Sequence, residues 1–578
     1  MRPTDPRLLS IRALNELRIL HPPTYVALRY LLDSSIVNSE SGWLHQTLPW
    51  KYASRVEPRF WPVLRFKKKF AAGGQIEYRP FLIPSPTTAL TEAVVLDQMS
   101  RSPAFSKLTF VYSYRWPANL RHAYTFEHFI MGYKSRARAI SETLSQTTTD
   151  VAVVADIEKF YPRIKQRTVM ARFQDAVGRS EMEGGIKETA ITLAQHVFAG
   201  SPGEVGMAIG PLTSHILGDL ALAPVDQAMS ERYPGRYFRY VDDIVIVVPR
   251  DQVENAKAQL KHALDVEGLK LNEEKTDVVS REDWLSHCPD QAVGVSEDSF
   301  EALVFRIKVF LSIYPGVLES LERAFLREGF ALPFQRLLAA ANRSYFRTWL
   351  HYLRRWRVLR QAVSDSEDSL ILRALGLRQN LLERVRKRFD RGIPSTGMKR
   401  RWAIQEVRYA VNRLVYLLPR ERFAELAHMT EGTPELIETY MFLHSVRRGE
   451  FEELLQFPGP SVAAAAAFLR RDGRTTAITR ELSKEEAHSA ALFSLYGVCS
   501  LNTNVLSALE HEQREYLRFC IGIPSDKREA NDFSYLDEIR SLQLGRQAVD
   551  RLRMLDKRFA DEEVTLFEAL YIGEYYDI

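Results

Sequence analysis

Two adjacent carboxylates between two apolar strands, in the segment RYFRYVDDIVIVVPR, constrain the fold of this chain more than any other feature. The run Ile244–Val248 is β-branched throughout, which predicts a strand buried on both faces. Asp242 and Asp243 then stand at the tip of a hairpin. Burying paired acids beside such strands is unfavourable unless a cation compensates their charge. The segment therefore predicts a site for Mg²⁺, a hard ion that takes one or two carboxylates together with substrate phosphates.

A second apolar strand, Val151–Ala155, ends in Asp156 and supplies a partner acid. Asp156 and Asp242 are expected to face each other from adjacent strand ends and to share two Mg²⁺ ions, for which Mn²⁺ can substitute. This is the arrangement of a two-metal nucleotidyl transferase. Taken alone, each acid, and the Asp242–Asp243 pair as well, is more typical of a solvated turn. The two buried strands, and the further motifs that follow in order, favour the metal site.

Four motifs in sequence order resemble the palm of reverse transcriptases. They are VVADIEKFYPRI around Asp156, GMAIGPLTS at 206–214, YVDD at 240–243, and LNEEKT at 271–276. The resemblance extends over residues 50–310. It implies an α+β fold with a right-hand polymerase palm and fingers, and an RNA-directed DNA polymerase that adds dNTPs to a DNA product.

The resemblance also implies roles for individual positions. The expected catalytic residues are Asp156, Asp242 and Asp243. The expected metal-binding positions are Asp156, Ile157, Asp242 and Asp243. The expected nucleotide-binding residues are Arg79, Arg115, Tyr161, Gly206 and Lys275.

Most of the nucleotide-binding residues also have a simpler interpretation. Tyr161 lies where reverse transcriptases carry an aromatic ring beneath the ribose, which would clash with a 2′-hydroxyl, but it is also typical of a core aromatic. Gly206 begins a turn whose glycines let backbone approach a base pair, and an ordinary strand-to-helix turn explains them equally well. In that turn, Thr213 and Ser214 are expected to cap the next helix. Lys275 either reaches the triphosphate or is a solvated lysine. Arg79 and Arg115 resemble the fingers cations that hold triphosphate oxygens.

The length of 578 residues predicts more than one domain. We expect the N-terminal segment and fingers at 1–150, the palm at 151–310, and a thumb-like, all-α region at 311–578. From about Leu332 the pattern is helical, and a helical-repeat array there would have to be degenerate because no fixed period is visible. The stretch 363–369 is typical of an exposed acidic connector.

The formal net charge of +5 is compatible with nucleic acid as a partner. Two segments of the C-terminal region are candidates for binding it: 345–357, which interleaves arginines with aromatics, and 384–401, where eight basic residues have only Asp390 as a nearby acid in the sequence. Amphipathic helices with solvated arginines would explain both segments as well.

Three cysteines, Cys288, Cys499 and Cys520, show no metal-ligand spacing and indicate reduced thiols in a cytoplasmic protein. The N-terminus lacks the apolar core of a signal peptide, and no apolar run approaches the length of a membrane span. We therefore expect no membrane partner.

The phrases SYRW, FYPRI and GMAIGPLTS resemble the bacterial abortive-infection and defence-associated reverse transcriptases. That resemblance implies DNA synthesis in anti-phage defence, either untemplated or directed by a dedicated noncoding RNA. It also implies a homo-oligomer or a complex with a second defence protein. Priming from a protein tyrosine is a further implication, for which the tail 571–578 is a candidate.

Two alternatives remain. The first is a reverse transcriptase like those of group II introns or retrons, which copies one bound RNA. The second is a non-catalytic scaffold that binds nucleic acid through its palm.

Overall fold

The computed structural model describes residues 5–34, 48–53, 57–70, 75–118, 122–201, 203–287, 299–332, 334, 364–473, 475–523, 534–543 and 548–556. The basic segment 345–357, Cys288 and the tail 571–578 lie outside these residues. The chain divides into two compact units. The first contains 1–63, 80–292 and 525–544, and the second contains 64–79, 293–524 and 545–578.

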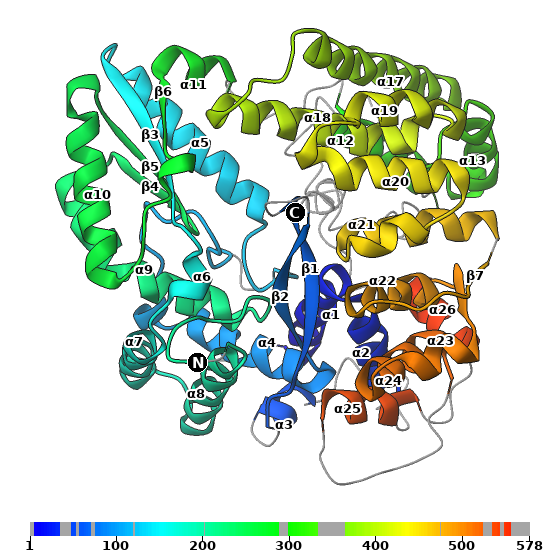
Figure 1. Cartoon of the computed structure of the whole chain (residues 1–578), viewed down its shortest axis with the longest axis horizontal. Helices are drawn as coiled ribbons and strands as arrows, with labels where there is room; N and C mark the ends of the chain where they lie inside the picture. Colours follow the sequence, from blue (N-terminus) through cyan, green and yellow to red (C-terminus); the bar gives the residue numbers. More distant parts are fainter. Residues whose placement is uncertain are drawn as a thin grey trace. The chain divides into compact units, whose positions relative to one another are not determined.

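The first unit is built on a four-stranded antiparallel sheet with the strand order β4–β5–β3–β6. Its strands are β3 (Asp150–Asp156), β4 (Tyr237–Tyr240), β5 (Asp243–Pro249) and β6 (Asp277–Ser280). Helices α5 (Phe129–Ser145) and α10 (Val253–Glu267) both pack on β3 and β5, on opposite sides of the sheet (Figure 1). Since both faces are covered, β3 and the centre of β5 are buried, which confirms the two strands expected around the acids.

Further helices of the first unit pack around this sheet and around one another. They are α1 (Pro6–Leu20), α2 (Pro22–Ser34), α3 (Leu48–Ala53), α4 (Pro86–Ser100), α7 (Gln166–Arg179), α8 (Gly184–Ala199), α9 (Thr213–Arg232) and α11 (Arg281–His287). The hairpin of β1 (Phe60–Phe70) and β2 (Ile76–Pro84) leads into α4, and its residues 64–79 are grouped with the second unit.

A helix from near the end of the chain completes the first unit. Helix α25 (Tyr535–Gln543) packs on α2 and brings Glu538 to the N-terminus of α4. The Glu538 carboxylate accepts hydrogen bonds from the Thr87 backbone N–H (2.7 Å) and the Thr87 hydroxyl (2.8 Å), and it pairs with Arg59 (3.2 Å). The unit is therefore not one continuous stretch of sequence, although the sequence pattern places 311–578 in a single C-terminal region.

The second unit is predominantly helical. Its longer helices are α12 (Phe300–Ile313), α13 (Leu318–Arg327), α17 (Glu367–Asp390), α18 (Gly397–Leu417), α20 (Ile437–Arg448), α21 (Pro460–Leu469), α22 (Lys484–Leu495) and α24 (His511–Ile521). Helices α17 and α18 pack on each other along buried leucines and valines. The boundary expected after residue 310 falls inside α12.

The expectation of an all-α C-terminal region is wrong in one detail. Strands β7 (Thr476–Ile478) and β8 (Cys499–Leu501) form a parallel pair. Each strand has three residues, which is too short to produce a recognisable alternation in the sequence.

The interpretation of 363–369 as an exposed connector is corrected at one position: Ser364, Ser366 and Asp368 are exposed, but Asp365 is buried and accepts a hydrogen bond from buried Arg306 (2.9 Å). Helix α17 begins directly after it, with a capping box between Ser366 and Ser369.

The basic stretch 384–401 is less free for nucleic acid than its sequence indicates. Arg386 pairs with Glu425, Arg388 pairs with Glu406, and Arg400 holds Glu435 through two contacts of 2.7 and 2.8 Å. These glutamates lie 18 to 39 residues away in the chain. Within 384–401 the sequence has one acid, Asp390, and Glu383 directly precedes the stretch, whereas folding brings three distant glutamates to its arginines.

Within the residues described, no helix is both long enough and apolar enough to cross a lipid bilayer.

The buried Glu538 contacts give a prediction for stability. Glu538→Ala should lower the free energy of unfolding by about 2–3 kcal/mol, because it leaves a buried N–H, a hydroxyl and a guanidinium without their acceptor. Urea unfolding followed by tryptophan fluorescence measures the change, since Trp61 stacks on Tyr535 of the same helix (5.7 Å between ring centroids).

A matched control is Glu188→Ala, at an exposed position of α8, which should change the stability by less than about 0.5 kcal/mol. Equal stabilities of the two variants would contradict the role given to Glu538.

Candidate active site

Three aspartates lie together where β3 ends and β5 begins. In the antiparallel register, Asp156 at the end of β3 is the direct partner of Asp243 at the start of β5. Asp242 precedes Asp243 in the two-residue turn that joins β4 to β5. The register therefore brings together the three acids that the sequence selected.

The turn that carries Asp242 is held in a sparsely populated backbone conformation. Val241 has a φ of +53°, which is unusual for a β-branched residue and needs support from its surroundings. The Val241 N–H donates to the Ser113 hydroxyl (3.0 Å), and its carbonyl accepts from the Arg239 guanidinium (3.0 Å). Both peptide groups flanking the strained residue are thus fixed, and the position of Asp242 with them.

Arg239 is itself fully buried, with 1 % of its surface exposed. It binds Asp226 through two contacts of 2.7 Å and reaches Asp219 at 3.1 Å. Asp219 also pairs with Lys107, and Asp226 accepts from the Tyr237 hydroxyl (2.8 Å). This bidentate geometry anchors the hairpin to helix α9.

Asp156 has two side-chain neighbours from the LNEEKT motif. Its Oδ2 accepts from the Lys275 ammonium (3.0 Å) and from the Asn272 amide (2.9 Å). Lys275, expected to reach a triphosphate, thus contacts a catalytic candidate in this structure. Ile157 has a buried side chain and bridges to Leu271, so only its backbone carbonyl has the chemistry of a metal ligand.

The electrostatics of the three acids fit a divalent cation. Burial raises the pKa of Asp242 to about 7, and the nearby Asp243 and Asp156 carboxylates add to the shift. A cation between the acids would remove both the repulsion and the desolvation penalty. In the described part of the chain, no three Asp, Glu, His or Cys side chains form a complete ligand set. Mg²⁺ usually retains water and takes substrate phosphates, so it does not require such a set.

Tyr161 and the Gly206 loop lie together. The backbone N–H groups of Gly206 and Met207 donate to the carbonyls of Ile164 (2.8 Å) and Tyr161 (3.0 Å). Gly206 has a φ of +108°, and a Cβ there would come within 2.4 Å of the Ser201 hydroxyl. Two of the predicted nucleotide-binding residues therefore belong to one backbone-bonded structure.

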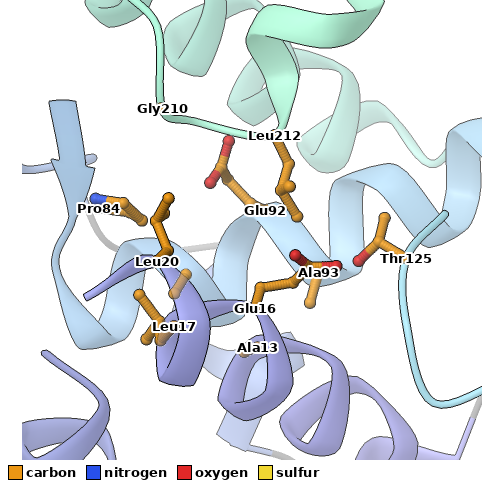
Figure 2. A pocket seen from close by; sticks show the side chains of 11 residues that line it. Ala13, Glu16, Leu17, Leu20, Pro84, Glu92, Ala93, Thr125, Gly210 and Leu212 are labelled. Carbon is orange, nitrogen blue, oxygen red and sulfur yellow. The ribbon is translucent and has the colours of Figure 1, made fainter. Parts of the chain in front are cut away.

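The far end of this loop rests on a buried carboxylate (Figure 2). Glu92 of α4 accepts from the Thr213 backbone N–H (3.0 Å) and the Thr213 hydroxyl (2.8 Å) at the start of α9. The expectation that Thr213 and Ser214 cap this helix is therefore wrong: the capping oxygen comes from α4, and Thr213 donates to it. A cavity of about 20 Å³ lies beside Glu92 and Glu16, with room for about one water molecule.

The two candidate phosphate ligands from the fingers are placed differently. Arg115 donates to the carbonyls of Val111 (2.7 Å) and Thr109 (2.7 Å) and lies over the ring of Tyr112, so its guanidinium stabilises its own loop. Arg79 is exposed on β2 and is grouped with the second unit. The structure does not bring Arg115 to the three acids.

Sequence reasoning missed Arg239 and Glu92. Glu92 had a visible signal, because it is a lone charge in the apolar stretch LTEAVV, whereas Arg239 stands between Arg236 and Asp242 and had no such signal. A charged residue in such a stretch is buried only with a partner. The partners themselves, on α9 and in the Gly206 loop, could not be read from these stretches.

The raised pKa of Asp242 predicts a pH-dependent stability without metal. Its pKa in the folded state is about 7, against an ordinary value of 3.8, so the wild-type protein loses stability as the pH rises from about 4 to about 7. Asp242→Asn should remove this loss, making the variant more stable than wild type by about 2–4 kcal/mol at pH 8 and nearly equal at pH 4.

Melting temperatures in a chelator at both pH values test this expectation. Asp251→Asn, at an exposed position after β5, is the control and should follow the wild type. If the stability difference between Asp242→Asn and wild type is no larger at pH 8 than at pH 4, burial and repulsion do not raise the pKa of Asp242 in the folded protein.

Comparison with known families agrees with this geometry. Residues 68–307 match the family described as reverse transcriptase (RNA-dependent DNA polymerase). No curated protein matches the chain. The matched range contains the sheet, all four motifs and the three aspartates. The chain therefore carries a reverse transcriptase domain and is an RNA-directed DNA polymerase, a nucleotidyltransferase that acts on dNTPs and nucleic acid.

Proposed function

We propose that this enzyme adds dNTPs to a growing DNA strand by a two-metal mechanism at Asp156, Asp242 and Asp243. The observation that supports it most directly is the register of β3 and β5, which pairs Asp156 with Asp243 and places Asp242 beside them. Asp156 and Asp242 hold both ions, and Asp243 is a weaker ligand or orients the others. When bound, Mg²⁺ lowers the pKa of the primer hydroxyl and stabilises the charge on the leaving pyrophosphate.

The side chains around the acids bind and orient the nucleotide. Tyr161 excludes the 2′-hydroxyl, and the Gly206 loop packs against the base pair. Lys275 holds Asp156 in this structure, and with a cation at that carboxylate its ammonium would be available to the triphosphate. Arg79 and Arg115 contribute positive charge, which for Arg115 requires release from the carbonyls of its own loop.

The broader role rests on the resemblance of the segments SYRW, FYPRI and GMAIGPLTS to bacterial abortive-infection and defence-associated reverse transcriptases. On that basis the enzyme acts in bacterial anti-phage defence, as a homo-oligomer or with a second protein. Its DNA product is templated by a dedicated noncoding RNA or is untemplated. We further propose that the helices of the second unit form a degenerate repeat. The enzyme acts in the cytoplasm of the bacterial host.

If these aspartates hold the metal ions, replacing one of them should abolish most of the activity and leave the folded structure intact. Asp156→Ala and Asp242→Asn should each lower the rate of dNTP incorporation with Mg²⁺ at least about 10³-fold, because each removes several kcal/mol of charge stabilisation from the transition state. Incorporation of labelled dNTPs on an RNA template with a DNA primer measures this, and circular dichroism checks the fold.

Asp251→Asn should retain activity close to wild type. The wild type and the three variants can be melted with and without Mg²⁺, which should stabilise only the wild type and Asp251→Asn. An active Asp242→Asn enzyme would overturn the assignment of the acids.

A second assay tests which template and which primer the enzyme uses. The purified protein receives labelled dNTPs and Mg²⁺ but no added nucleic acid. A product that is sensitive to protease and resistant to ribonuclease would support protein-primed, untemplated synthesis. Loss of product after ribonuclease pretreatment of the enzyme would instead support a carried RNA template. The absence of product in every metal, together with no activity on an added template, would favour a binding scaffold.

A further inference from the structure

A stack of aromatic rings lies against Tyr161. The rings of His215 and Tyr114 are parallel within 15°, with centroids 3.5 Å apart. Phe126 packs edge-on against both rings, at 6.1 Å from His215 and 5.4 Å from Tyr114. His215 Nδ1 lies 3.5 Å from the Tyr161 hydroxyl oxygen. We call Tyr114, Phe126 and His215 the His215 stack.

Both ends of the His215 stack are anchored to the structure that carries the acids. His215 lies in the first turn of α9, and one turn later Asp219 binds Arg239, the residue that holds the Val241 carbonyl. Tyr114 has a φ of +47° and follows Ser113, whose hydroxyl accepts from the Val241 N–H. The stack therefore has little freedom to move relative to the YVDD turn.

His215 is neutral, and a neutral imidazole can either donate to or accept from a hydroxyl. Burial lowers the pKa of His215 to about 3, an effect that Lys107 strengthens and Asp219 opposes. At neutral pH the imidazole is uncharged, with one nitrogen as donor and the other as acceptor. Either tautomer is able to pair with the Tyr161 hydroxyl, which both donates and accepts.

We propose that His215 is a positioning residue for sugar selection, which holds the Tyr161 ring in place through the contact between Nδ1 and the hydroxyl. The inference rests on the proposed function, in which the Tyr161 ring excludes a 2′-hydroxyl. The Tyr161 ring packs beside Phe160, and the contact at its hydroxyl further opposes a turn that would admit the additional oxygen of a ribonucleotide. A ring that is also held at its hydroxyl cannot turn without breaking a second contact, and small displacements of a positioning group change rates strongly.

The test measures kcat and KM for one dNTP and the matching rNTP, and compares the ratio of the two kcat/KM values. His215→Phe keeps an aromatic ring in the stack but has no Nδ1, and Tyr161→Phe removes the hydroxyl from the other side. Each variant should lower the ratio about two- to tenfold, the effect expected for one hydrogen bond between neutral groups. The change should appear as a lower KM for the rNTP, and in His215→Phe the kcat for the dNTP should stay within about twofold of wild type.

Coupling between the two positions gives a sharper criterion. The double variant should lose no more discrimination than either single variant, because all three lack the same contact. His215→Asn, whose amide can donate and accept, should discriminate better than His215→Phe. His262→Phe, the same substitution at an exposed position of α10, should leave the ratio unchanged.

Tyr161→Ala separates the failure of this inference from the failure of the proposed function, and should lower the ratio at least about 100-fold. An unchanged ratio in Tyr161→Ala would overturn both the sugar gate and the role of His215. A lowered ratio in Tyr161→Ala, with unchanged ratios in His215→Phe and Tyr161→Phe, would overturn the role of His215 alone. A His215→Phe enzyme that is equally slow with both nucleotides would show a structural role, and would also overturn it.

Discussion

The buried guanidinium of Arg239 is the interaction on which the rest of the site depends. It satisfies Asp226 in bidentate fashion, reaches Asp219, and still donates to the carbonyl of Val241, the residue with the strained backbone. Loss of one partner of such a buried pair costs about 3–5 kcal/mol, because the remaining charge has no compensation. The strained turn persists because this network and the Ser113 hydroxyl hold it from both sides, and the direction of Asp242 follows from the turn.

Two clusters of aspartates lie near each other, one on helix α9 and one at the hairpin, and their charges are compensated differently. Asp219 and Asp226 are neutralised by Arg239 and Lys107, and they serve the structure. At the hairpin, burial raises the pKa of Asp242, and repulsion from Asp243 and Asp156 adds to the shift. This contrast supports the proposed divalent cation at the hairpin acids. The half-exposed Lys275 is a replaceable partner for Asp156, since its flexible stem lets it leave when an ion arrives.

The polymerase domain also depends on residues distant in the sequence. Glu538 lies 451 residues from Thr87, yet its carboxylate receives the N–H and hydroxyl of that residue at the N-terminus of α4. Helix α4 in turn presents Glu92 to the loop that begins at Gly206. A chain of contacts thus connects a C-terminal helix, the helix after the β1–β2 hairpin, and the loop proposed to face the base pair.

The sequence by itself determined the two buried strands, the three aspartates at their ends and the order of the four motifs. These are local properties, because side-chain period and β-branching fix a strand and its faces, and antiparallel pairing of two such strands brings their terminal acids together. The tertiary structure alone decided the partners of Arg239 and Glu92, the capping of α9 from α4, the docking of α25, and the pairing of Arg386, Arg388 and Arg400 with distant glutamates. A charged residue within a buried segment indicates that a partner must be present. Which partner it obtains depends on how helices and strands pack, and no local pattern contains that information.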